Sequence, residues 1–150
     1  MKHVVIISIL ILFFGLQSCN PTIKSVYRDD FRSASDSEIK NVQKEVNATN
    51  SNKSILVLTQ TYKGEKIVIY QNGKILYSEY PITNLNNRIA SYFSFNNQEN
   101  LLIKDHNSKK EIEIPTKKAK KHKYIYVMKK TNKGKFQYVI TYSNTLRPLK

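Results

Sequence analysis

The fold is decided by residues 66–80, which read KIVIYQNGKILYSEY. Two short runs of β-branched and aromatic residues, 66–70 and 74–80, flank the dipeptide Asn72-Gly73. Asn-Gly between two such runs is the strongest short-range signal for a two-residue β-hairpin, because both residues tolerate a positive φ. We therefore predict that these two runs pair antiparallel.

The same pattern of short strands continues on both sides of this hairpin. Alternating apolar residues are separated by turn-forming residues at spacings of about 8–12 residues, which is typical of an all-β fold. We predict an antiparallel β-sandwich of about seven or eight strands, with a barrel as the alternative. Pro81 and Pro115 cannot donate to a sheet and are expected at strand ends or edges. The predicted strands span residues 54–60, 66–70, 74–80, 88–95, 100–104, 110–114, 122–130 and 136–143.

These strands define a predicted domain over residues 54–150, whose core is expected from the apolar residues that alternate along them. The expected core residues are Ile55, Val57, Ile67, Ile69, Ile75, Leu102, Ile112, Ile114, Ile125, Val127 and Ile140.

Residues 19–53 have a different composition, rich in Asn, Ser, Asp and Lys and poor in apolar residues. This composition predicts a polar tether, which if fully flexible would reach about 30 Å. Within it, Ser35-Asp36-Ser37-Glu38 is a capping-box pattern and is followed by apolar residues at helical spacing. A short helix over residues 36–47 is expected, and a spacer without secondary structure is the alternative.

The charge is strongly positive, with 25 Lys and Arg against 11 Asp and Glu and a formal net charge of +14. Residues 115–150 contain eleven Lys and Arg and no carboxylate. The densest group is Lys117, Lys118, Lys120, Lys121 and Lys123. Such a run is attracted to anionic lipid, glycan or acidic protein, whereas the excess of Lys over Arg disfavours nucleic acid. The alternative is a solvated loop whose lysines reflect overall composition.

Four tyrosines form a second pattern, in two strands expected to pair around Gly134. Tyr124, Tyr126, Tyr138 and Tyr142 are predicted to share one cross-strand aromatic face. Such a face either stacks on sugar rings or packs against the other sheet. The chain has no Trp, which favours packing.

The residues available for catalysis are few. One Cys and three His exclude a disulfide framework within the chain and disfavour a zinc site. Motifs for nucleophilic, phosphate-binding or metalloprotease chemistry are absent from the sequence, so no catalytic residue, metal or cofactor is predicted. The alternative is a small hydrolase that uses Asp105, His106, Glu111 or Glu113, of which the two glutamates would share one face of a strand.

The N-terminal residues 1–18 have the features of an export signal. A short positive start precedes an apolar run over residues 4–16, which is shorter than the roughly 20 residues that a membrane-spanning helix needs. The run ends in Leu16-Gln17-Ser18-Cys19, which resembles the lipobox of bacterial lipoproteins. Leu16 and Ser18 match the positions that the signal peptidase recognises. The resemblance implies cleavage before Cys19, lipidation of its thiol and acylation of its new amino terminus.

Two or three acyl chains would hold the protein stably on a membrane outside the cytoplasm. Asn20, rather than Asp, follows Cys19. By resemblance to known sorting signals this indicates the outer membrane, on either of its sides. The leading hypothesis is an anchored, non-catalytic binding or scaffolding module of the cell envelope. The alternatives are the small hydrolase and an inhibitor or immunity-type lipoprotein that binds an acidic protein through the basic C-terminal quarter.

Overall fold

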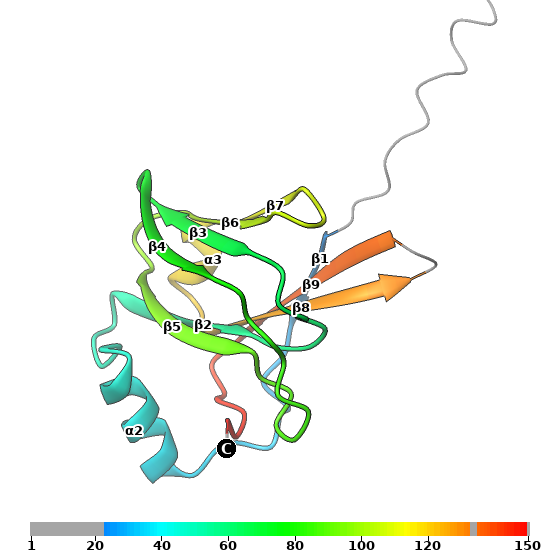
Figure 1. Cartoon of the computed structure of the whole chain (residues 1–150). Helices are drawn as coiled ribbons and strands as arrows, with labels where there is room; N and C mark the ends of the chain where they lie inside the picture. Colours follow the sequence, from blue (N-terminus) through cyan, green and yellow to red (C-terminus); the bar gives the residue numbers. More distant parts are fainter. Residues whose placement is uncertain (1–22, 133–134, 150) are drawn as a thin grey trace, which may run out of the picture.

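A computed structural model describes residues 23–132 and 135–149, and in this part of the chain two β-sheets pack face to face (Figure 1). One sheet has five strands in the order β1-β9-β8-β2-β5, and the other has four in the order β4-β3-β6-β7. The predicted all-β sandwich is therefore confirmed. Cys19, the signal-peptide residues and Gly134 lie outside the described residues.

The predicted strand segments agree with the observed strands to within three residues at each end. The five-stranded sheet contains β1 (Ile23–Tyr27), β2 (Lys53–Leu58), β5 (Ser91–Asn96), β8 (Tyr124–Asn132) and β9 (Lys135–Ser143). The four-stranded sheet contains β3 (Ile67–Gln71), β4 (Lys74–Glu79), β6 (Leu101–Asp105) and β7 (Lys110–Ile114). The helices are α2 (Asp36–Glu45) and the short α3 (Thr116–Ala119).

The hairpin that decides the fold forms as predicted. Asn72 and Gly73 have φ values of 50° and 73°, and Gln71 lies opposite Lys74 in the antiparallel β3–β4 pair. Pro81 and Pro115 follow β4 and β7, which are the two edge strands of the four-stranded sheet. Each proline therefore lies beyond a strand end, where its missing N–H removes no ladder bond.

The five-stranded sheet is mixed rather than antiparallel throughout. β2 pairs with β8 in parallel, and β1 pairs with β9 in parallel. Hairpin signals predict only antiparallel neighbours, whereas parallel partners need a long crossover connection. Between β2 and β8 that connection includes the whole four-stranded sheet.

The folded domain begins earlier than the sequence predicted, so the expected tether over residues 19–53 is wrong from residue 23 onward. Ile23 lies opposite Tyr138 on β9, and β1 extends the five-stranded sheet by one strand. The predicted helix is present as α2, with Ser35 as its N-cap and Val42 only 1% exposed. A five-residue strand between polar segments has a weak local signal, and its pairing with β9 is visible only in three dimensions.

The hydrophobic core has two parts. The larger part fills the space between the sheets, and the smaller lies on the outer face of the five-stranded sheet beneath α2 and the C-terminal residues Leu146 and Leu149. Two expected core residues are misplaced. Ile75 is 59% exposed beside a register shift in the β3–β4 pair, and Leu102 is only half-buried because it shares the outward face of β6 with Lys104.

Candidate functional site

The four tyrosines do not form one face. In the β8–β9 pair Tyr126 lies opposite Thr141 and Tyr138 lies opposite Lys129, so the tyrosines of the two strands point to opposite sides of the sheet. Tyr124 and Tyr126 belong to the outer cluster, whereas Tyr138 and Tyr142 face the inner core. All four are at most 2% exposed. The predicted aromatic face is therefore wrong, because the hairpin register places the two pairs on opposite faces.

The lysine run contains α3 rather than a plain loop. Lys117, Lys120 and Lys121 are exposed on it. Lys118 is half-buried, with Nζ 5.1 Å from the centre of the Tyr142 ring and 5.6 Å from that of Tyr27. Three of the five lysines predicted to bind an anionic surface are thus exposed, whereas Lys118 contacts two aromatic rings and Ser25.

Lys123 has a structural role instead. Its ammonium donates to the carbonyls of Ala48, Asn50 and Lys53 at 2.5, 2.9 and 2.9 Å. Burial lowers the pKa of Lys123. This side chain fastens the segment between α2 and β2, so it is not available to an anionic partner.

The residues proposed for the hydrolase do not form a free catalytic group. Asp105, His106 and Glu111 line a depression at the β6–β7 turn, but three lysines line it too. The Asp105 carboxylate turns inward, and Glu111 pairs with Lys104 at 2.8 Å. Glu113 is exposed and accepts a hydrogen bond from Asn100. The geometry therefore does not support glycoside hydrolysis by Glu111 and Glu113.

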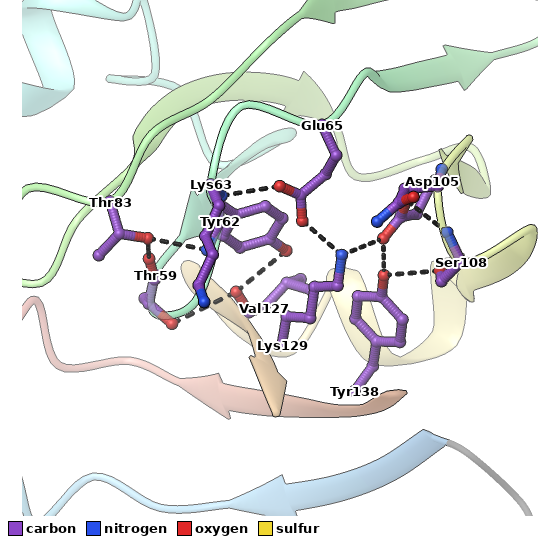
Figure 2. A network of polar contacts seen from close by, with 11 residues as sticks. Thr59, Tyr62, Lys63, Glu65, Thr83, Asp105, Ser108, Val127, Lys129 and Tyr138 are labelled. Carbon is purple, nitrogen blue, oxygen red and sulfur yellow. Dashed lines mark hydrogen bonds and ion pairs between the residues drawn. The ribbon is translucent and has the colours of Figure 1, made fainter. Parts of the chain in front are cut away.

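The inward-facing Asp105 belongs to a polar cluster between the two sheets (Figure 2). Lys129 of β8 lies between the carboxylates of Glu65 and Asp105, bonding to both, with Nζ 2.8 Å from Asp105 Oδ2. The hydroxyl of Tyr138 donates to Asp105 and lies 3.1 Å from Ser108 Oγ. The side chains of Lys129, Glu65 and Asp105 are 2%, 7% and 0% exposed. Every member has a partner, which is typical of a buried network that holds a fold together.

The pKa of Asp105 follows from these contacts. Burial raises it, but the hydrogen bonds from Lys129, Tyr138 and the Ser108 amide outweigh burial and hold the pKa below its usual value. Burial and the neighbouring Asp105 carboxylate raise the pKa of Tyr138 well above its usual value. At neutral pH the cluster therefore holds a carboxylate and a neutral phenol, with no proton donor or acceptor open to solvent.

A hollow with an unusual charge lies on the outer face of the five-stranded sheet, where α2 does not cover it. This hollow of ≈ 390 Å³ is floored by side chains that alternate outward along β1, β8 and β9. We call it the basic hollow. Its lining residues are Lys24, Val26, Arg28, Phe31, Thr59, Gln60, Tyr126, Met128, Lys130, Gln137, Val139, Thr141 and Arg147.

Cations and aromatic rings meet at one end of the basic hollow. The Arg28 guanidinium lies 4.6 Å from the centre of the Phe31 ring, and the Arg147 guanidinium lies 5.6 Å from the rings of both Phe31 and Tyr126. The Tyr126 hydroxyl accepts from the Arg147 amide at 3.0 Å and donates to Thr145 at 2.9 Å. These contacts fix the segment that carries Arg147, and burial raises the pKa of Tyr126 to about 12.

The charged side chains that line the basic hollow are all positive. Four of its lining residues are Lys or Arg and none is Asp or Glu. Among the described residues only Arg28 of these four makes an ion pair, with Asp30 at 2.6 Å. The hollow therefore presents cations over an apolar floor made of Val26, Met128 and Val139.

Sequence reasoning missed the basic hollow, because one of its walls comes from the segment assigned to the tether and another from the residues after the last predicted strand. The available signal was the alternation of Lys24, Val26 and Arg28, which places these residues on one face of a strand.

The comparisons with known proteins identify no relative: no family model matches the chain, and no curated protein matches its sequence. The described residues include no helix that is long and apolar enough to cross a membrane. Within this same part of the chain, His, Cys, Asp and Glu nowhere gather in a group of three that could hold a metal ion.

Proposed function

We propose that this chain is a non-catalytic binding module of the cell envelope, anchored at the outer membrane through a lipidated Cys19. It binds the anionic group of its ligand in the basic hollow. The observation that carries the proposal is the set of four cationic side chains around an apolar floor, with no carboxylate in the lining.

The shape and chemistry of the hollow favour one class of ligand. Its volume of ≈ 390 Å³ lies in the range of small-molecule sites, about 300–1,000 Å³. Arg147 supplies planar donors that suit a phosphate, sulfonate or carboxylate, and Arg28, which is paired with Asp30, adds positive charge beside it. The floor of Val26, Met128 and Val139 suits an apolar or aromatic part of the same molecule. We therefore expect an amphiphilic anion, such as an acyl or aromatic chain with an acidic head.

The test is a fluorescence titration of the mature protein with 8-anilinonaphthalene-1-sulfonate, an aromatic sulfonate. Arg147→Ala removes a guanidinium that lines the hollow but leaves the backbone contact to Tyr126 in place. We expect this substitution to weaken binding about tenfold, because a charge-assisted contact is lost. High salt should weaken binding by the wild type.

Arg88→Ala is the matched control. Arg88 lines a different, more apolar hollow of ≈ 680 Å³ beside Ile82 and Leu85, and it is not part of the lining of the basic hollow. We expect this variant to bind as the wild type does. Equal loss in both variants, or loss only in Arg88→Ala, would contradict the basic hollow as the site.

A further inference from the structure

The place where the folded domain begins sets how it sits at a membrane. The orientation depends on the proposed anchoring at Cys19, which lies four residues before Ile23. Four residues span at most about 14 Å, whatever their conformation. Since Ile23 is fixed opposite Tyr138 on β9, the end of the sandwich that holds Ile23 must lie close to the bilayer.

Contacts in the fold define which other elements share this end. Tyr138 bonds to Asp105 and Ser108, so the β6–β7 turn lies next to the start of β1. The His106 amide donates to the carbonyl of Lys66, which brings the start of β3 to the same place. In Figure 1 the start of β1, the β6–β7 turn and the far end of β8 and β9 lie on the same side of the molecule. We call this side the anchor end.

The anchor end presents positive charge. Two of its carboxylates, Glu65 and Asp105, are buried on Lys129, and the exposed Glu111 pairs with Lys104. Glu79, opposite Ile67, is exposed at the edge of this end and is outnumbered by its lysines. Among the described residues no ion pair involves the five other lysines here, of which Lys110 is half-buried and the rest are exposed. They are Lys24, Lys66, Lys109, Lys110 and Lys130.

The lysine run around α3 is set farther from the anchor. Lys118 donates to Ser25 Oγ at 3.2 Å and lies over the ring of Tyr27, the last residue of β1, and a strand rises by about 3.3 Å per residue. Ser25 and Tyr27 are therefore about 7 Å and about 13 Å beyond Ile23 along β1, and Lys118 lies between these two levels. Attraction to a charged membrane falls off within a Debye length of about 8 Å. The lysines nearest the bilayer are those of the anchor end, although α3 has the denser sequence run.

We propose that the anchor end docks on anionic phospholipid headgroups and so fixes the orientation of the anchored domain. Its lysines contact the headgroups, while α2 and α3 remain away from the surface. Lys24 and Lys130 also line the basic hollow, so the hollow opens beside the membrane. An amphiphilic anion held there would be received from, or delivered to, the membrane surface.

The test is lysine footprinting of the lipidated mature protein in vesicles, with a water-soluble acylating reagent and mass spectrometry. One set of vesicles contains phosphatidylcholine alone, and the other contains about a third phosphatidylglycerol. We expect Lys66, Lys109 and Lys110 to react about fivefold more slowly on the anionic vesicles. The exposed lysines in and just after α3, Lys117, Lys120 and Lys121, should react at the same rate on both.

Two triple variants with equal charge change provide the control. Lys→Glu at residues 66, 109 and 110 should abolish the protection of Lys24 and Lys130, whereas Lys→Glu at 117, 120 and 121 should leave it. Protection of the α3 lysines, or equal rates at the anchor end on both vesicles, would overturn the docking. Failure of the proposed anchoring would give a different result. The protein would have no added lipid mass and would not remain bound to either set of vesicles.

Discussion

Lys129 on β8 and Asp105 at the end of β6 form a buried ion pair, with 2.8 Å between Nζ and Oδ2, that joins the two sheets of the sandwich. Glu65, which precedes β3, contacts the same ammonium. One lysine of the five-stranded sheet therefore contacts two places in the four-stranded sheet. These are the segment just before β3 and the last residue of β6, which pairs with β3. The cluster also buries two carboxylates of the anchor end, which removes them from its surface.

Removal of the shared ammonium should be strongly destabilising. Lys129→Ala leaves Glu65 and Asp105 buried without their cation, and we expect the free energy of unfolding to fall by about 3–5 kcal/mol. Urea unfolding at pH 7 measures this change. Lys104→Ala breaks the solvent-exposed pair with Glu111 and should have a far smaller effect. Similar effects for the two variants would contradict a central role for Lys129.

Removal of the hydroxyl from two buried tyrosines should affect the stability of the protein differently. Tyr138 donates to Asp105, so Tyr138→Phe is expected to cost about 1.5–3 kcal/mol, the range for hydrogen bonds to charged groups. The buried hydroxyl of Tyr142 has no hydrogen-bond partner among the described residues. Tyr142→Phe should therefore leave stability unchanged or raise it. Thermal unfolding of both variants measures this difference. A larger loss of stability in Tyr142→Phe than in Tyr138→Phe would contradict the hydrogen-bond assignment of the two hydroxyls.

Stability should fall in acid because of Asp105. Its pKa in the folded protein lies below the usual value of 3.8, so the folded state binds the proton less tightly than the unfolded chain. The resulting stabilisation is present above pH 3.8 and is lost as the pH falls through the lower folded value. Urea unfolding across this range should show the loss. Asp105→Asn, although less stable at pH 7, should lose less on acidification, and an identical slope would count against this assignment.

The lysine run should divide into structural and surface residues. Lys123→Met leaves three carbonyls without their shared donor and is expected to cost about 1–3 kcal/mol. Lys121→Met, at an exposed position, should leave stability nearly unchanged. Chemical denaturation of the two variants provides the comparison. Equal stability would mean that the Lys123 contacts contribute nothing.

The strands could be predicted because their signals are local. Asn72-Gly73 sets a turn that only residues tolerant of positive φ adopt, and alternation along β7 separates Glu111 and Glu113 from the buried Ile112 and Ile114. These patterns fix each strand's position and which of its faces is buried. They contain no information about partners far away in the chain.

The features that were missed depend on such distant partners. β1 is defined by its parallel pairing with β9, more than a hundred residues later. The division of the tyrosines depends on the register that places Tyr138 opposite Lys129. The basic hollow joins Lys24 and Arg147, which lie near opposite ends of the chain. None of these relationships follows from spacing within a short segment.

The proposed function and the proposed orientation both require that Cys19 holds this domain at a membrane surface. The most direct measurement is the intact mass of the protein expressed in its own cell type, together with detergent partitioning, compared with Cys19→Ala. We predict a chain that lacks residues 1–18, has the mass of a diacylglyceryl group and an acyl chain on Cys19, and enters the detergent phase. The Cys19→Ala protein should have no added lipid mass and should stay in the aqueous phase. A wild-type protein without lipid, partitioning as the variant does, would contradict the claim.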